Sequence, residues 1–520
     1  MKNKIIPLSQ KGINMNNPVQ AKGAAWGTKI TKYRVIVGLL TLFPIMVYSQ
    51  SVTLTLPETI AIASDSSLQA FSAKNQYLSS YWAFRSFRAA RLPSLTLKMM
   101  PFQYYRDFTR QYVSEADRYV YLFQENLYSM GNLSLAQNFD LTGGTVFVDT
   151  ELGYIRNFGD EVYSQFTSVP IRVGYSQKLF GFNKFKWEKR IEPLKYESAK
   201  KKFLYDREDI SVTSIGYFFD LAMAQTEYDM AKNNLASSDT LYRIGEERYK
   251  IASISKSDLL TLKLDVVNAQ NTFKNADLSL KRAMSAFVSY LNMDKGTQIR
   301  LDLPNRPKDM LISIDEALQY ARENNPDYLT NKQNVLEAEQ AVDQATKSAV
   351  FDADFIASIG FNQAALNLRD VYLRPVRQNV VSISLSIPLI DWGVRKGKVN
   401  MARNNLNVTN ISVQQKEVSL EQDVVMTVND FNIQQDMIRS AEEAMNLGNM
   451  VYNTTKERFI IGKADINSLT LSLGRQQEAQ KNYISALRNY WLSYYKIRKM
   501  TLFDFEQGRT LTQVFENERP

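Results

Sequence analysis

The chain has no cysteine and no histidine among its 520 residues. The absence of cysteine excludes disulfide bonds, cysteine-ligated zinc and thiol nucleophiles, and the absence of histidine excludes every catalytic arrangement that needs an imidazole. The sequence also has no glycine-rich phosphate loop after a strand and no local pair of carboxylates that singles out a site. The composition therefore argues against an enzyme, and it indicates no cofactor and no metal.

The net charge of +9 is concentrated at the N-terminus. Residues 1–49 contain seven basic residues and no acidic residue, so the rest of the chain is close to neutral. A basic surface for nucleic acid is therefore not predicted, because the excess charge lies in one short segment.

The same segment has the three parts of a secretory signal. Lys29, Lys32 and Arg34 precede the apolar run 35–48, which ends in small residues. The run is shorter than the roughly 20 residues that span a bilayer, and Pro44 interrupts it. We predict that residues 1–49 are a signal peptide, with a membrane anchor as the alternative. Without cysteine, the N-terminus of the exported chain cannot be lipidated.

Proline is absent from two long spans, between Pro193 and Pro304 and between Pro388 and Pro520. Such spans favour long helices, since an interior proline costs about 3 kcal/mol. Both spans carry a heptad seam typical of helix packing. The first seam comprises Leu259, Leu262, Val266, Ala269, Phe273, Ala276, Leu280, Ala283, Phe287 and Tyr290. The second, weaker seam comprises Leu469, Ser472, Gln476, Ala479, Tyr483, Ala486, Tyr490, Ser493, Ile497 and Met500.

Other segments alternate with a period of two, which predicts strands. In residues 380–390, apolar side chains at Val381, Ile383, Leu385, Ile387 and Leu389 alternate with serines. Similar runs cover residues 355–361 and 169–175, and another begins at Leu95. A half-buried soluble sheet gives this pattern, and so do strands that cross an outer membrane as a barrel.

The chain repeats itself. At an offset of 210 residues, 176–186 matches 386–396 and Arg248-Tyr249 matches Arg458-Phe459. At an offset of 258 residues, 54–68 matches 312–326. We predict a first repeat over residues 50–300 and a second over 301–520, each with a helix, strands and a long helical hairpin. The first half has extra residues, including two alternating runs that flank Thr142-Gly143-Gly144 and predict a hairpin over 135–155.

Four features in the same order carry a resemblance to a known family. They are the tandem repeat, the segment 314–317 with Asn325-Pro326, the strand exit 388–393, and a turn motif in which an Arg-aromatic pair precedes a small residue. The chain resembles the TolC family of outer-membrane efflux proteins, and residues 179–200 resemble a Bacteroidetes-type branch of it.

This resemblance implies a mainly α fold with transmembrane β-structure. The expected architecture is a TolC-like trimeric β-barrel in the outer membrane with a long α-helical coiled-coil barrel in the periplasm, built from two tandem repeats. The implied partners are two further copies of the chain, a periplasmic membrane-fusion adaptor, an inner-membrane RND or ABC transporter, and outer-membrane lipid.

Simple arithmetic supports this picture. From Asn183 or Gly393 to the helix turn is roughly 65 residues, or about 100 Å of helix at 1.5 Å per residue. The few strands of one chain cannot close a barrel alone, since the smallest membrane barrels use about eight. We favour four strands per subunit, with the 135–155 hairpin at a rim.

The candidate site residues lie in the turn motifs and at the strand exit. The turn motifs predict a periplasmic entrance formed by Arg248, Tyr249, Ala252 and Asp258 in the first repeat and by Arg458, Phe459, Gly462 and Asp465 in the second. The strand exit is formed by Pro388, Leu389, Asp391 and Gly393.

In the family, acidic residues beside the turns are implied to ring the entrance. Asp258 matches that pattern, whereas the second repeat has Ser468 and Leu471 at the corresponding positions. We expect Asp465 to substitute, which gives a weak cation preference carried by Asp258 and Asp465 together. Simple solvation of these charges is the alternative.

The sequence thus predicts a passive exit duct for small molecules or protein cargo, within a tripartite efflux or type I secretion system. The alternative is a periplasmic coiled-coil adaptor or scaffold that is anchored by its N-terminal apolar segment.

Overall fold

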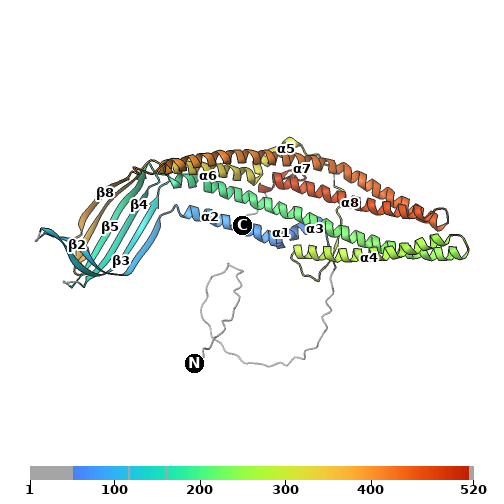
Figure 1. Ribbon diagram of the computed structural model, residues 1–520, viewed down its shortest axis with the longest axis horizontal. Helices are drawn as coiled ribbons and strands as arrows, with labels where there is room; N and C mark the ends of the chain where they lie inside the picture. Colours follow the sequence, from blue (N-terminus) through green and yellow to red (C-terminus); the bar gives the residue numbers. More distant parts are fainter. Residues whose placement is uncertain (1–50, 115–116, 159–161, 308, 514–520) are drawn as a thin grey trace, which may run out of the picture. The chain divides into compact units, whose positions relative to one another are not determined.

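The computed structural model describes residues 51–114, 117–158, 162–307 and 309–513 (Figure 1). The signal peptide predicted over residues 1–49 lies outside the described residues. Among the helices of the described part, none combines the length and the apolar character that a bilayer-spanning helix needs.

The helices occur twice along the chain in the same order and with nearly the same lengths. α3 and α7 have 67 residues each, and α1 and α5 have 11 each. The first set is α1 (Leu56–Ser66), α2 (Leu68–Ala89), α3 (Lys184–Lys250) and α4 (Lys256–Tyr290). The second set is α5 (Ile314–Asn324), α6 (Pro326–Ser348), α7 (Val394–Ile460) and α8 (Ile466–Thr501).

The division predicted between residues 300 and 301 falls inside a strand. β6 (Gln298–Leu301) pairs in parallel with β1 (Ser51–Leu54), so the segment between the two halves is tied back to the start of the described chain. The repeat boundary itself stays a prediction.

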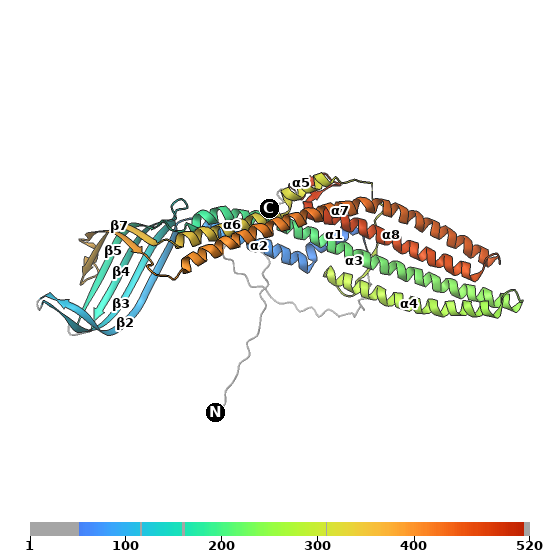
Figure 2. The same cartoon turned by 45° about the horizontal axis from the view of Figure 1, so that its top comes forward.

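The long helices pack in pairs. α3 contacts α4, α7 contacts α8, and α3 also contacts α8, so the two hairpins lie side by side (Figures 1 and 2). All ten residues of each predicted seam are buried or half-buried, which confirms the packing frame. Phe273, for example, lies against Tyr228 of α3 with a ring-centroid distance of 5.3 Å.

The main core lies where both hairpins meet the shorter helices α1 and α5. It contains fully buried aromatic residues from three long helices, namely Phe218 and Phe219 of α3, Phe287 of α4 and Phe431 of α7. A smaller apolar cluster near the helix turns comprises Leu241, Leu262, Tyr452, Phe459 and Leu469. The large core packs against the middle of α3 and α7, and the small cluster holds the two hairpins together near the turns.

A buried ion cluster supports the main core. Arg498 of α8 contacts Glu208 of α3 and Asp504 of β9 (Phe503–Asp504), each at 3.0 Å. β9 pairs with β10 (Arg509–Thr510) in a short antiparallel ribbon. Because both carboxylates are almost fully buried, Arg498 is what keeps their charges compensated.

Six of the described strands form one antiparallel sheet in the order β2-β3-β4-β5-β7-β8. They are β2 (Ser94–Val113), β3 (Arg118–Asn138), β4 (Thr145–Asn157), β5 (Tyr163–Leu179), β7 (Asp352–Ala365) and β8 (Val376–Ser386). The expectation of four strands with the 135–155 hairpin at a rim is therefore wrong. The hairpin exists, but β3 and β4 pair continuously from Asn126–Asn157 to Asn138–Thr145 within the sheet.

The register places apolar side chains on one face of the sheet, which we call the apolar face. Leu95 pairs with Leu135, Val173 with Ile359, and Phe355 with Ile383. The exposed members of this face are Leu95, Leu97, Met99, Leu133, Leu135, Leu152, Val173, Ile359, Phe361, Val381, Ile383 and Leu385. The opposite face carries polar residues, including Lys98, Asn132, Asp149, Arg172, Ser382 and Ser384. The alternation read from the sequence is thus confirmed in β2, β7 and β8, whereas in β5 a register shift between Ser168 and Arg172 interrupts the run predicted over residues 169–175.

One strand is shorter than predicted. The alternation continues to Leu389, but β8 ends at Ser386, which pairs with Asp352 at the start of β7. No residue of β7 remains to pair beyond that point, and Pro388 lacks the N–H that a ladder hydrogen bond needs. Ile387 and Leu389 therefore belong to the connection between β8 and α7.

Candidate functional site

The two helix turns occur where the sequence places them and share one backbone geometry. α3 ends at Lys250 and α7 at Ile460, and the next helix begins six residues later in both cases. Ala252 and Gly462, at equivalent positions, adopt left-handed φ angles of 55° and 79°. Glycine accepts this conformation without cost, whereas alanine pays roughly 1–2 kcal/mol for it.

The carboxylates of the two turns cap helices, with their positions exchanged. Ser255 is the N-cap of α4, and Asp258 accepts hydrogen bonds from both the backbone N–H and the hydroxyl of Ser255. In the second turn Asp465 is the N-cap of α8 and accepts from the N–H of Ser468 at 2.6 Å. Each helix start thus uses one serine and one aspartate, in opposite order.

This exchange explains the departure from the family pattern at Ser468. The acidic residue is not lost from the second turn, because it has moved three residues towards the N-terminus. The hydrogen bonds from Ser468 lower the pKa of the Asp465 carboxyl below its ordinary value. Whether Asp258 and Asp465 line an entrance stays a prediction, since capping alone accounts for both residues.

Arg248 joins the two turns. Its Nη2 donates a hydrogen bond to the carbonyl oxygen of Ile460 at 2.5 Å, and its guanidinium lies 5.5 Å from the ring centre of Phe459. It also lies close to Gly462, where a Cβ atom would be 3.6 Å from Nη2. Arg458, its counterpart, donates instead to Lys463 within its own turn. Tyr249 is exposed, whereas Phe459 is buried.

The predicted strand exit is the start of α7. The Asp391 carboxylate accepts hydrogen bonds from the backbone N–H groups of Gly393 and Arg395, which lowers the pKa of Asp391. Gly393 has a left-handed φ of 87° at the N-cap position. Leu389 and Trp392 are 90% and 94% exposed, so this connection presents apolar side chains outward.

Sequence reasoning missed a charged cluster on the polar face of the sheet. Arg172 of β5 contacts Asp149 of β4 through two donor nitrogens at 3.0 and 2.5 Å. Asn132 of β3 donates to the same carboxylate at 3.1 Å. The period-two pattern places Arg172 on this face, but only the strand register brings it opposite Asp149.

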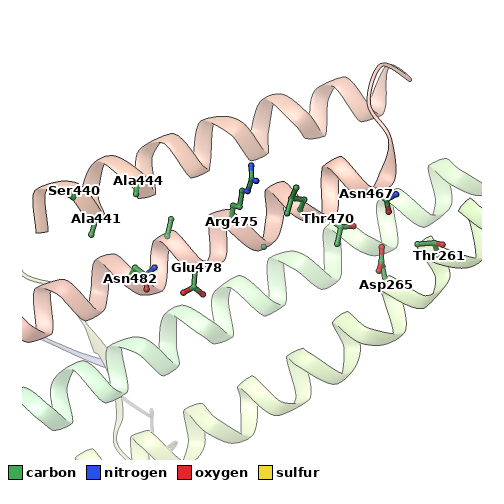
Figure 3. Close-up of a pocket in the computed structure, with 13 residues that line it drawn as sticks. Thr261, Asp265, Ser440, Ala441, Ala444, Asn467, Thr470, Arg475, Glu478 and Asn482 are labelled. Atoms are coloured by element: carbon green, nitrogen blue, oxygen red, sulfur yellow. The ribbon is translucent and has the colours of Figure 1, made fainter. Parts of the chain in front are cut away.

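A groove of about 1010 Å³ opens between α4, α7 and α8 (Figure 3). Small residues on α7 and α8 form much of it, including Ser440, Ala441, Ala444 and Gly474. Thr261 and Asp265 of α4 lie along its other side, and Arg475 and Glu478 of α8 lie within it (Figure 3). The groove wall is made largely of small side chains, with the charged side chains of Asp265, Arg475 and Glu478 between them. A groove of this kind suits a helical partner.

Solved structures with this architecture include outer-membrane channels. The CmeC channel of Campylobacter jejuni is 13% identical, with a TM-score of 0.63 and 89% of each chain covered. VceC of Vibrio cholerae is 13% identical, with a TM-score of 0.60, over 86% of this chain and 95% of VceC. The open-state MtrE channel of Neisseria gonorrhoeae is 14% identical, with a TM-score of 0.56, over 86% of this chain and 88% of MtrE. The fold class predicted from the sequence is confirmed.

Residues 317–501, from α5 to the end of α8, match the family described as outer membrane efflux protein. A comparison with curated proteins finds no match. The family match over residues 317–501 and the shared fold confirm the resemblance that the sequence shows.

Proposed function

We propose that three copies of this chain form a passive outer-membrane exit duct, fed by a periplasmic adaptor and an energised inner-membrane transporter. The duct opens and closes but performs no catalytic step. The observation that carries the proposal is the six-stranded sheet, which has one apolar face and two unpaired edges, β2 and β8, among the described strands.

The edges are suited to pairing with further copies. Every neighbouring pair in the sheet is antiparallel, so β8 runs opposite to β2. A second copy added edge to edge therefore continues the antiparallel order. Six strands are too few to close a membrane barrel, whereas three copies supply eighteen.

Cross-linking tests this closure in a chain without native thiols. Thr96 and Ser384 lie on the polar face, each two residues from the helix end of its edge strand. The Thr96→Cys, Ser384→Cys double variant should give covalent trimers under oxidation. The matched control, Ser134→Cys with Ser384→Cys, uses an inner strand of the same face and should give none.

A channel must also conduct. The purified protein should form trimers that conduct ions in planar bilayers. A cysteine placed at Ile383 should react with a lipid-soluble reagent, and a cysteine placed at Ser384 should react with a water-soluble reagent. A protein that stays monomeric, does not conduct and fractionates with the inner membrane contradicts the proposal and supports the anchored adaptor. The adaptor alternative has no role for a wide sheet with an exposed apolar face.

We further propose that the groove between α4, α7 and α8 receives a helical hairpin of the adaptor. Gly474 offers a test, because a Cβ added there meets nothing within 4 Å, so a large side chain fills the groove without an internal clash. Gly474→Trp should abolish export while trimer yield and conductance remain. Val408→Trp, on an exposed part of α7, is the control and should leave export unchanged.

A further inference from the structure

Exposed apolar side chains gather at the end of the sheet that meets the helices. The register brings the connections before β2, between β3 and β4, after β5, before β7 and after β8 to this end (Figure 2). They present large apolar residues to solvent, which we call the junction belt. The belt comprises Leu92, Phe139, Leu141, Phe180, Leu389, Ile390 and Trp392.

Contacts among these connections hold the junction belt in one place. Asp140, in the turn between β3 and β4, pairs with Arg91 at 2.8 Å and with Lys189 at 3.6 Å. The side chain of Asn183 donates to the backbone carbonyl of Asp140. Phe180 lies against Phe351, with a ring-centroid distance of 6.1 Å, just before β7. The belt is therefore supported by several segments of the chain.

The belt continues the apolar face of the sheet. Leu385, Ile387 and Leu389 follow one another at intervals of two residues across the end of β8. Trp392 has a left-handed φ of 53°, a conformation that costs energy for a residue with a side chain. An exposed tryptophan held there at a backbone cost indicates a role outside the fold of the single chain.

Next to the belt lies an excess of positive charge. Exposed cations cover the end of α2 and the first turns of α3 and α7, namely Arg85, Arg88, Lys184, Lys186, Lys189, Arg190, Lys396 and Lys398. The carboxylates at this end of the sheet are fewer than these eight cations, namely Asp140, Glu188, Asp352, Asp354 and Asp391. Asp140 pairs with two cations, Glu188 pairs with Lys184, and Asp391 caps α7. The net charge of this surface is therefore positive.

We propose that the junction belt and these cations bind anionic phospholipid headgroups of the periplasmic leaflet. The inference rests on the proposed outer-membrane function, which places this end of the barrel at that leaflet. Tryptophan and other aromatic residues favour the headgroup level, and nearby lysine and arginine residues are attracted to an anionic surface.

Fluorescence quenching tests the position of Trp392. In bilayers of brominated phosphatidylcholine, the wild-type trimer should lose part of its tryptophan emission, and Trp392→Phe should remove most of that loss. The control Trp491→Phe, a half-buried residue within the helical core, should leave the quenching unchanged. Equal quenching in wild type and Trp392→Phe, with conductance intact, overturns the inference while the channel function stands.

Lipid dependence tests the cations. Phosphatidylglycerol should raise the unfolding temperature of the wild-type trimer relative to phosphatidylcholine alone. The gain should shrink at roughly 0.5 M salt, where screening acts within a few ångströms. The triple variant Lys186→Gln, Lys396→Gln, Lys398→Gln should lose the gain. A control triple variant, Lys232→Gln, Lys263→Gln, Lys274→Gln, lies away from the junction and should keep it.

Two further results would overturn the proposal. One is a trimer that conducts normally but unfolds at the same temperature in both lipids. The other is a Leu141→Cys variant that cross-links in intact cells to a protein rather than reacting with a lipid-soluble reagent. Loss of conductance and trimers together would instead contradict the proposed channel function.

Discussion

The guanidinium of Arg248, at the end of α3, donates a hydrogen bond to the backbone carbonyl of Ile460, at the end of α7. The two residues are 212 positions apart and belong to different repeats. Their counterparts, Arg458 and Lys250, do not make the reciprocal contact, because Arg458 bonds to Lys463. Of this duplicated arginine pair, Arg248 bonds across to the other turn and Arg458 bonds within its own turn.

Removing this arginine should loosen the second turn. We expect Arg248→Ala to cost roughly 0.5–1.5 kcal/mol of local stability, the usual net value of a hydrogen bond. Hydrogen exchange of the amides at 459–463 should become faster, and global unfolding should change little. Arg458→Ala is the control, because its bond stays within one turn. Equal exchange in both variants would show that Arg248 does not hold the turns together.

The cap at Asp465 should give α8 a pH dependence. Its pKa is lowered in the folded chain, so the ionised cap stabilises the helix above the ordinary value of 3.8, and that stabilisation is lost as pH falls through the lowered folded value. Hydrogen exchange at 466–472, corrected for intrinsic rates, should therefore rise in acid.

Two variants separate the cap from the charge itself. Asp465→Ala should exchange quickly at all pH values. The double variant Asp465→Ser, Ser468→Asp swaps the two residues and so recreates the arrangement of the first turn. Its hydrogen exchange should match that of the parent protein. If that double variant resembles Asp465→Ala, the two turns do not share one capping scheme.

A charge in the first seam should disrupt the pairing of α3 with α4. Phe273 is half-buried against Tyr228, so Phe273→Asp removes an aromatic contact and places an unpaired carboxylate in a packed interface. We expect a loss of about 2–4 kcal/mol and a lower trimer yield. Lys274→Asp, the exposed neighbour, should have little effect. Thermal unfolding of both variants checks this, and equal melting temperatures would refute the seam.

The buried ion cluster should be the most sensitive charged site in the core. Arg498→Met removes the cation that pairs with both Glu208 and Asp504, although these carboxylates are only 6% and 3% exposed. Breaking such a group on one side costs roughly 3–5 kcal/mol. Lys499→Met removes a pair with the half-exposed Asp209 and should cost less than about 1 kcal/mol. Urea unfolding compares the two, and similar midpoints would contradict the distinction.

Much of the fold could be read from local patterns. The proline-free spans and the heptad frame predict α3, α4, α7 and α8, because helix periodicity is visible within one segment. The turn motifs mark both helix reversals, and the offset of 210 residues is the offset between the starts of α3 and α7. Period-two alternation locates strands at residues 95, 169, 355 and 381, because each strand has one apolar face.

The number of strands in the sheet could not be predicted from such local patterns. β3 and β4 follow the expected hairpin, but the sequence does not say whether a hairpin joins a sheet or stands at its edge. That choice depends on pairing between residues far apart, such as β5 with β7 across about 190 positions. The pair Asp149–Arg172 likewise depends on strand register, and the bond from Arg248 to Ile460 depends on how the two helix turns pack together.

The sequence by itself thus determined the long helices, their turns and the alternation of most strands, because each depends on neighbours along the chain. Only the tertiary structure decided that six strands share one sheet, that the aspartates of the turns cap helices, and that exposed apolar residues and cations gather at one end of the sheet. Those features depend on contacts between segments whose separation in sequence carries no local signal.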